Sequence, residues 1–306
     1  MINDPDRSLD KMHQHMGVGP GDLKTLLDAA KNGAVGYIGI LTDKPGNVRY
    51  YPNAHELADP IAGKLAPIPG FFVNASEGQK IRALALKNAG VRLISMGETP
   101  RTEAYNIFAD LPGKSESRIQ LSCHTDGGAI DDASGVSAIL SLARWCVQRK
   151  NQNHTVQVVF TAGHFSNFAG DSAYMVHYLE PRVKNVKLNL TVEHLGTHCE
   201  IADDNFVLSN HPCPSPIFAS SPALEALVKD AMKQADPHAA LLPIWAGIAG
   251  GEGSCWHFIY HEPSVFYIEP VEYLATTADT MEKYDPAQMQ KVLKMCRQII
   301  SEFDSN

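Results

Sequence analysis

One stretch of the chain, residues 119–135, gathers the residue types that metal chemistry needs. Its first six residues alternate between apolar and polar side chains up to His124, the pattern of a strand that enters a buried sheet. A glycine-rich segment follows, with carboxylates at Asp126, Asp131 and Asp132. Open α/β sheets bind their ligands in turns after the carboxyl ends of strands, and histidine with aspartate suits a divalent ion such as zinc. The segment therefore predicts a metal site.

A simpler interpretation of the same stretch is a polar loop that ends in a helix cap. Ser134 comes directly before a segment whose apolar residues have helical spacing, and serine is a favoured N-cap residue. The stretch by itself leaves both interpretations open, so the choice depends on the groups that other strand ends supply.

Two further expected strands also end in polar groups. The strand expected over residues 156–160 leads to His164, and the strand expected over residues 186–192 leads to Glu193 and His194. The carboxyl ends of parallel strands meet at one edge of a sheet, so these side chains can converge although they are far apart in sequence. Spacing alone does not decide which of them do.

The elements that position these groups form a regular alternation of strands and helices. Such an alternation predicts an α/β fold with a mostly parallel sheet covered by helices on both faces. The expected strands cover residues 104–111, 118–123, 156–160, 186–192, 241–245 and 264–268, and the expected helices cover residues 135–149, 171–178, 222–234 and the segment from Pro286 to Phe303.

A smaller α/β unit is predicted before this domain. After a polar start, its expected elements are a helix over residues 22–32, strands over 34–41, 71–74 and 91–95, and a helix over 79–89 that ends at Gly90. No internal repeat or low-complexity segment interrupts the chain.

Composition excludes several classes of protein. The 306 residues are 44% hydrophobic and 20% charged, which is ordinary for a globular protein with a full core. The net charge of −8 and the lack of a basic cluster argue against binding to nucleic acid. No apolar run is long enough for a membrane span, and no signal peptide is visible.

The six cysteines show no Cys-x-x-Cys pair. In a chain of this size they are typical of scattered, buried thiols. We therefore expect a cytoplasmic location, and the oligomeric state stays open.

Motifs of two other hydrolase classes fail. Residues 253–256 imitate the text around a cysteine-protease nucleophile, but that chemistry needs a histidine about 130–150 residues downstream, and the chain ends well before that distance from Cys255. There is also no Gly-x-Ser-x-Gly elbow for a serine hydrolase.

The central stretch resembles a known metal signature. His-Thr-Asp at residues 124–126 and Gly-Ala-Ile-Asp-Asp-Ala-Ser-Gly at residues 128–135 are similar to the motifs of the zinc aminopeptidases of peptidase family M28. The resemblance implies a three-layer zinc-exopeptidase-like domain over residues 100–306. It also implies a partial protease-associated-like domain over residues 1–99.

The family's site holds two zinc ions that share one bridging aspartate. Carried over motif by motif, the resemblance implies that His124 and Glu193 are ligands of the first ion and that Asp131 is the bridging carboxylate. It further implies that Asp126 orients His124 from behind.

Other positions depart from the family pattern. His164 stands where the family has its general base, Phe165 where it has a glutamate ligand of the second ion, and Ala275 where it has that ion's histidine. The resemblance therefore implies one zinc ion, held by His124, Asp131 and Glu193.

In this scheme His164 and Asp126 are the catalytic residues, because an imidazole that titrates near neutral pH can act as a base. The alternatives are a degenerate pocket without metal, an unfamiliar site that uses His164, His194 or His198, and a His164 that is only a core residue.

The implied function is hydrolysis of a peptide or small amide by a metal-activated water. Two rival functions remain at this stage. One is a non-catalytic protein that binds its partner in the same cleft, and the other is a related hydrolase or acyl transferase with a non-peptide substrate.

Overall fold

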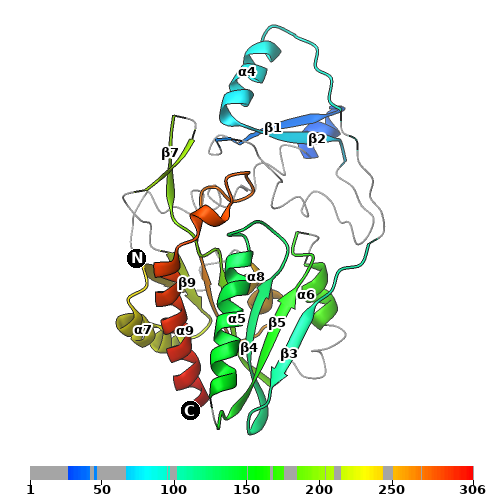
Figure 1. Cartoon of the computed structure of the whole chain (residues 1–306). Helices are drawn as coiled ribbons and strands as arrows, with labels where there is room; N and C mark the ends of the chain where they lie inside the picture. Colours follow the sequence, from blue (N-terminus) through cyan, green and yellow to red (C-terminus); the bar gives the residue numbers. More distant parts are fainter. Residues whose placement is uncertain are drawn as a thin grey trace.

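A seven-stranded sheet forms the centre of the molecule, in the order β10-β9-β11-β6-β4-β5-β3 (Figure 1). Most neighbouring strands are parallel, whereas β3 runs antiparallel to β5 and β11 runs antiparallel to β9. The expected α/β fold with a mostly parallel sheet is therefore confirmed. The computed structural model describes residues 27–41, 45–46, 67–94, 96, 102–149, 151–165, 168–175, 185–203, 205–209, 215–243, 251–269 and 271–305.

The elements of this domain follow the expected alternation. Its strands are β3 (Ile107–Leu111), β4 (Ser115–His124), β5 (His154–Thr161), β6 (Val186–Glu193), β9 (Ser215–Ala219), β10 (Ala239–Pro243) and β11 (Ser264–Ile268). Its helices are α5 (Ala133–Gln148), α6 (Ala169–Tyr174), α7 (Pro222–Ala235), α8 (Glu252–Ser254) with the π-helix η5 (Cys255–Ile259), the 3-10 helix η6 (Met281–Lys283) and α9 (Pro286–Ser305).

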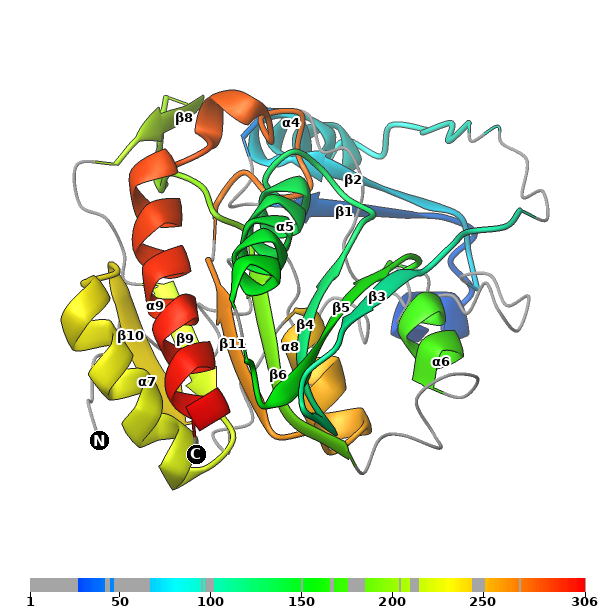
Figure 2. The ribbon, with the colours of Figure 1, turned by 60° about the horizontal axis from the view of Figure 1, so that its bottom comes forward.

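The main hydrophobic core lies between the sheet and helices α5, α7 and α9, which Figure 2 shows on one face of the sheet. Alternate residues of the central strands supply this core, for example Ile119 and Leu121 of β4 and Leu190 of β6, all almost fully buried. Helix α9 begins as expected, because the Asp285 carboxylate accepts the amides of Ala287 and Gln288 at 2.9 and 3.0 Å.

The opposite face of the two central strands is polar although it is buried. Ser122 of β4 lies 2.9 Å from both the Asn189 amide oxygen and the Thr191 hydroxyl of β6. Gln120 donates to Asn189 at 3.1 Å and to the Glu262 carboxylate at 3.3 Å. We call these five residues the polar seam, and all are at most 2% exposed.

Helices α8 and η5 cover this face. Helix α8 contacts β4, β6 and β11, and beside the seam a second apolar cluster joins Val159 of β5, Tyr174 of α6 and Trp256 of η5. Two successive strand pairs of the seam, Gln120 with Asn189 and Ser122 with Thr191, are in direct register. The seam therefore fixes how β4 and β6 are aligned.

The smaller unit expected near the N-terminus contains two parallel strands, β1 (Tyr37–Leu41) and β2 (Gly70–Asn74), and one helix, α4 (Ala75–Ala85). Asn74 caps α4 by accepting the Glu77 amide at 2.9 Å. Residues 27–31 are helical, and the rest of the helix expected over 22–32 lies outside the described residues. The boundary at residue 99 and the protease-associated character of this unit stay predictions.

Several expectations about local structure were wrong. Residues 91–94 form no strand, and α4 ends before the expected Gly90 cap, with Leu86 as its C-cap. The alternation also gave no sign of β9 or of the two-stranded ribbon of β7 (Cys199–Ala202) and β8 (Asn205–Leu208). These strands have only four or five residues, which is too short for a clear period.

The described cysteines agree with the expectation of buried thiols. Cys123, Cys146, Cys199, Cys255 and Cys296 are buried and form no disulfide, and Cys213 lies outside the described residues. Within the described part of the chain, no helix combines the length and the apolarity that crossing a membrane requires.

Glu262 in the polar seam predicts an unusual pH dependence of stability. Burial raises its pKa to about 8, against about 4.3 for a free glutamate. Between these values the folded state binds more protons than the unfolded state, so stability falls as the pH rises, by about 1.4 kcal/mol per unit at most.

We expect Glu262→Gln to remove this loss, because glutamine keeps the acceptor for Gln120 without a charge. Urea unfolding should show the variant more stable than wild type at pH 8 by a few kcal/mol and close to it near pH 4. The exposed Glu282→Gln serves as control. An equal effect of Glu262→Gln at both pH values would contradict the assignment.

Candidate metal centre

The candidate site lies where β4 and β6 end side by side. The two strands pair in parallel along their length, and their last residues are His124 and Glu193. Side chains alternate between faces in a strand, so both residues continue the row of the polar seam. His124 Nε2 lies 3.9 Å from Glu193 Oε2, and both side chains are almost fully buried.

The His124 ring is fixed by its other nitrogen. Nδ1 lies 2.7 Å from the carbonyl oxygen of Asp126, which assigns the proton to Nδ1 and leaves the lone pair of Nε2 pointing into the site. Nε2 is buried and, among the described residues, has no hydrogen-bond partner. This is the arrangement of a metal-ligating histidine.

Asp126 lies next to His124 as expected, but the main contact differs from the prediction. Its carbonyl, and not its carboxylate, meets the ring at hydrogen-bond distance, since the nearest carboxylate oxygen lies at 3.7 Å. The carboxylate accepts the backbone amides of His164 and Phe165 at 3.2 and 3.4 Å. Burial alone would raise the pKa of Asp126, but His124 and these amides lower it.

Asp131 reaches the site from the loop between β4 and α5. Its Oδ1 lies 3.6 Å from His124 Nε2. The loop is held from outside by Asp279, whose carboxylate accepts the amides of Ile130 and Asp131 at 2.7 and 3.5 Å. A cis peptide bond joins Asp131 to Asp132.

The cap of α5 corrects one expectation. Asp132, and not Ser134, is the N-cap, because its carboxylate accepts the Gly135 amide at 3.0 Å. Ser134 lies in the first turn, where its hydroxyl donates to the Ile130 carbonyl and accepts the Leu195 amide. It thus joins the two loops that carry the site.

The Glu193 carboxylate is held by a backbone clamp. Its Oε1 accepts the amides of Glu252 and Gly253 at 2.8 and 3.3 Å, while Oε2 is buried without a hydrogen-bond partner among the described residues. Gly251 packs so closely that a Cβ there would lie 2.6 Å from Oε2. One oxygen is therefore fixed and the other is free to bind an ion.

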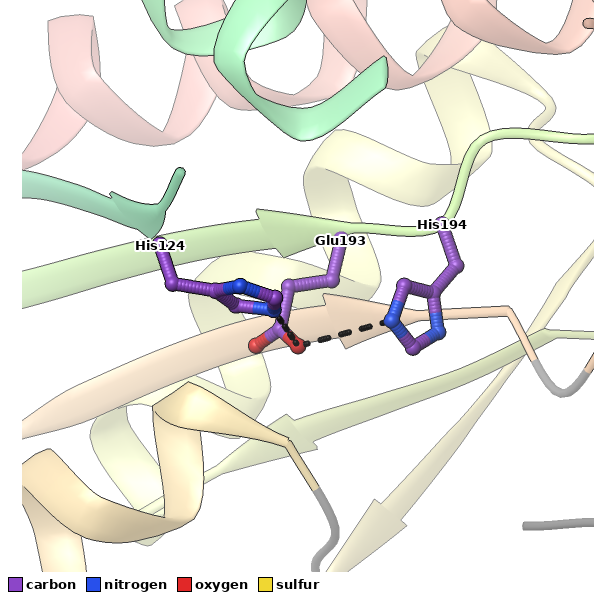
Figure 3. Close-up of side chains that lie close together, drawn as sticks. All are labelled: His124, Glu193 and His194. Carbon is purple, nitrogen blue, oxygen red and sulfur yellow. Dashed lines mark ion pairs between the residues drawn. The ribbon is translucent and has the colours of Figure 1, made fainter. Parts of the chain in front are cut away.

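His194 also points into the site, although it was not in the predicted ligand set. Its Nε2 lies 3.2 Å from Asp131 Oδ1 and 3.9 Å from Glu193 Oε2. Figure 3 shows its ring facing Glu193 from the side opposite His124. The sequence carried a signal, because His194 directly follows the carboxylate at a strand end, but neighbours in a strand normally face opposite ways. A left-handed backbone, with φ of 59°, turns His194 inward.

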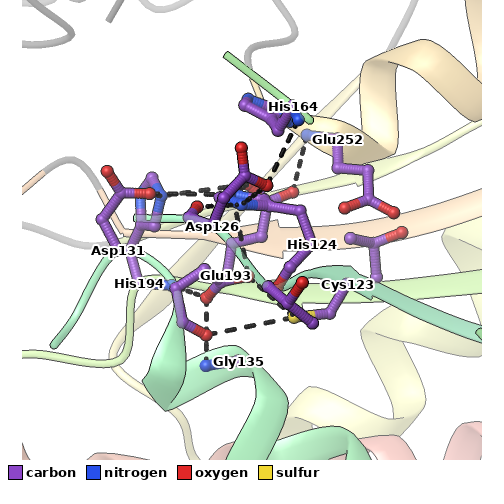
Figure 4. Close-up of polar contacts among 12 residues, drawn as sticks. Cys123, His124, Asp126, Asp131, Gly135, His164, Glu193, His194 and Glu252 are labelled. Carbon is purple, nitrogen blue, oxygen red and sulfur yellow. Dashed lines mark hydrogen bonds and ion pairs between the residues drawn. The ribbon is translucent and has the colours of Figure 1, made fainter. Parts of the chain in front are cut away.

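His164 and Phe165 lie beside this cluster (Figure 4 includes His164). The His164 ring stacks on the His124 ring with centroids 4.0 Å apart, and Phe165 presents its edge to His124 at 5.8 Å. Phe165 and the buried Ala275 offer no ligand atom. His198 pairs with Glu272, with Nδ1 and Oε1 3.6 Å apart, and does not join the cluster.

The electrostatics of the cluster favour a cation. Burial raises the pKa of Glu193 and raises that of Asp132 to about 7. Burial would lower the pKa of His194, but Asp131 and the other carboxylates raise it to about 9. The site thus holds more buried acceptors than its protons satisfy, and a divalent ion would replace those protons.

The donor set fits a zinc-like ion. Among the described residues, ligand atoms of His124, Glu193 and His194 lie within 4.8 Å of one another, and Asp131 Oδ1 approaches both imidazoles. Imidazole nitrogens and carboxylate oxygens are usual zinc ligands. The orphaned Nε2 and Oε2 atoms are the ones that such an ion would bind.

The molecule therefore has an α/β fold whose candidate metal ligands gather at the carboxyl ends of parallel strands. The sequence model of peptidase family M28 matches residues 106–300, and the chain belongs to this family. No curated protein sequence matches the chain significantly.

Solved structures share the fold at low identity. A peptidase M28 precursor from Shewanella amazonensis is 18% identical over 90% of this chain, with a TM-score of 0.63. BSAP, a zinc aminopeptidase from Bacillus subtilis, is 17% identical over 92%, also with a TM-score of 0.63. The LapA aminopeptidase of Legionella pneumophila is 17% identical over 66%, with a TM-score of 0.51. This chain spans 62%, 67% and 56% of these proteins, respectively.

The clamp around Glu193 yields a test of the site. We expect Gly251→Ala to lower zinc affinity about 10–100-fold, the usual effect of disturbing an outer-shell contact, because the new methyl group would press on the Glu193 carboxylate. Competition with a chromophoric chelator measures this affinity.

Gly33→Ala is a matched control. Both glycines have a positive φ, 75° and 87°, but a Cβ at Gly33 meets nothing within 4 Å. An unchanged affinity in Gly251→Ala, or an equal loss in both variants, would contradict the role of the clamp.

Proposed function

We propose that this chain is a zinc-dependent hydrolase that cleaves a peptide or small amide bond. The observation that supports this most is the convergence of His124, Asp131 and Glu193 on one buried point, with ligand atoms that lack protein partners. Membership of peptidase family M28 gives the reaction class, and two of the structural neighbours are described as aminopeptidases.

In this proposal one zinc ion is held by the three predicted ligands. Zinc bound there would lower the pKa of a water and polarise the scissile carbonyl. The loss of ligand atoms at Phe165 and Ala275 argues for a single ion. The chain's own part is to hold the ligands in place through Asp126, Asp279 and the clamp on Glu193.

His164 is the proposed base. Its ring lies parallel to the His124 ring, 4.0 Å away, at the edge of the cluster. Its backbone amide is tied to Asp126, the residue that also fixes His124. An imidazole in this place can take a proton from a water in the site without binding the ion itself.

The test is an assay on aminoacyl amides with zinc-loaded protein. Chelation should abolish hydrolysis and added zinc should restore it. His164→Ala should lower kcat/KM about 10²–10⁴-fold, the usual contribution of general base catalysis, while zinc content stays at the wild-type level.

His164→Phe separates catalysis from packing, because phenylalanine can keep the stack on His124 but cannot accept a proton. The base role predicts that both variants are inactive. Full activity of His164→Phe would show that His164 only packs. A zinc-loaded wild type that hydrolyses no amide would favour a binding protein instead.

A further inference from the structure

We infer that His194 is a fourth protein ligand of the metal ion, so that the chain supplies two imidazoles and two carboxylates. This deepens the proposed function, because it rests on the same metal site, but it does not require that the protein hydrolyses anything. The predicted ligand set had only one histidine, and a second one changes the geometry and the water access of the site.

The four ligand atoms form a closed ring. Asp131 Oδ1 lies 3.6 Å from His124 Nε2 and 3.2 Å from His194 Nε2. Glu193 Oε2 lies 3.9 Å from both imidazole nitrogens. A tetrahedral zinc ion with bonds of about 2.0–2.2 Å separates its ligands by about 3.3–3.6 Å. The observed spacings lie around this range, so small side-chain shifts complete the tetrahedron.

His194 is held for this role before any ion binds. Its Nδ1 lies 3.2 Å from the carbonyl oxygen of Glu269, which places the proton on Nδ1 and leaves Nε2 as the ligand atom. The Glu269 carboxylate accepts the Gly196 amide at 2.6 Å and the Tyr267 hydroxyl. Glu269 therefore fixes both the ring and the turn that carries it, in the way that Asp126 fixes His124.

A fourth protein ligand has a chemical consequence. Structural zinc sites are closed by four protein ligands, whereas catalytic sites keep one position for water. In this chain a water can enter only as a fifth ligand or when one protein ligand moves away. His194 thus sets how tightly the ion is held and how readily water reaches it.

The best test variant is His194→Asn. Asparagine tolerates the left-handed backbone at this position, and its amide can still donate to the Glu269 carbonyl, but it cannot reach the ion. His194→Ala is the second variant, in case the asparagine disturbs folding. His198→Ala is the matched control, since His198 lies in the same segment but pairs with Glu272.

X-ray absorption at the zinc edge counts the imidazoles around the ion. We expect two in the wild type and in His198→Ala, and one in His194→Asn. Chelator competition should show a loss of zinc affinity of more than about 100-fold in His194→Asn, beyond what an outer-shell change costs.

One imidazole in the wild type, or wild-type affinity in both His194 variants, would overturn the inference and leave the proposed hydrolase intact. Zinc that binds through His194 in a protein without activity on amides would support the inference and overturn the hydrolysis. A wild type that binds no zinc would overturn both.

Discussion

The parallel pairing of β4 with β6 is the constraint on which the rest of the site depends. Because side chains alternate along a strand, this register places His124 and Glu193 next to each other on one face. A slip of one residue would turn either side chain into the hydrophobic core on the other face. The polar seam below them opposes such a slip, since Ser122 and Thr191 are paired only in the observed register.

A second theme is that each side chain of the cluster is held by an atom that the ion would not use. His124 and His194 each point Nδ1 at a backbone carbonyl, and Glu193 gives one oxygen to backbone amides of the α8 segment. What remains in the centre is a set of unsatisfied acceptors in a dry place, where uncompensated charge is costly. A divalent cation relieves that cost, which is why the cluster is best explained as a metal site.

Periodicity was enough to predict the mostly parallel sheet and its helices, because long elements with one buried face leave a clear pattern. It failed for short elements such as β7 and β8, and at the cap of α5, where two neighbouring residues could both serve and the loop geometry chose Asp132. His194 could not be predicted as a ligand, because its direction depends on a left-handed backbone and on Glu269, which is 75 residues away. Local sequence specifies elements, whereas these contacts form only after the sheet is assembled.

The most direct measurement is anomalous diffraction at the zinc edge from crystals grown with zinc. The account predicts one strong peak per chain, within about 2.0–2.2 Å of His124 Nε2, Asp131 Oδ1 and Glu193 Oε2. The absence of a peak at the ends of β4 and β6, or a second equally strong peak beside Phe165 and Ala275, would contradict it.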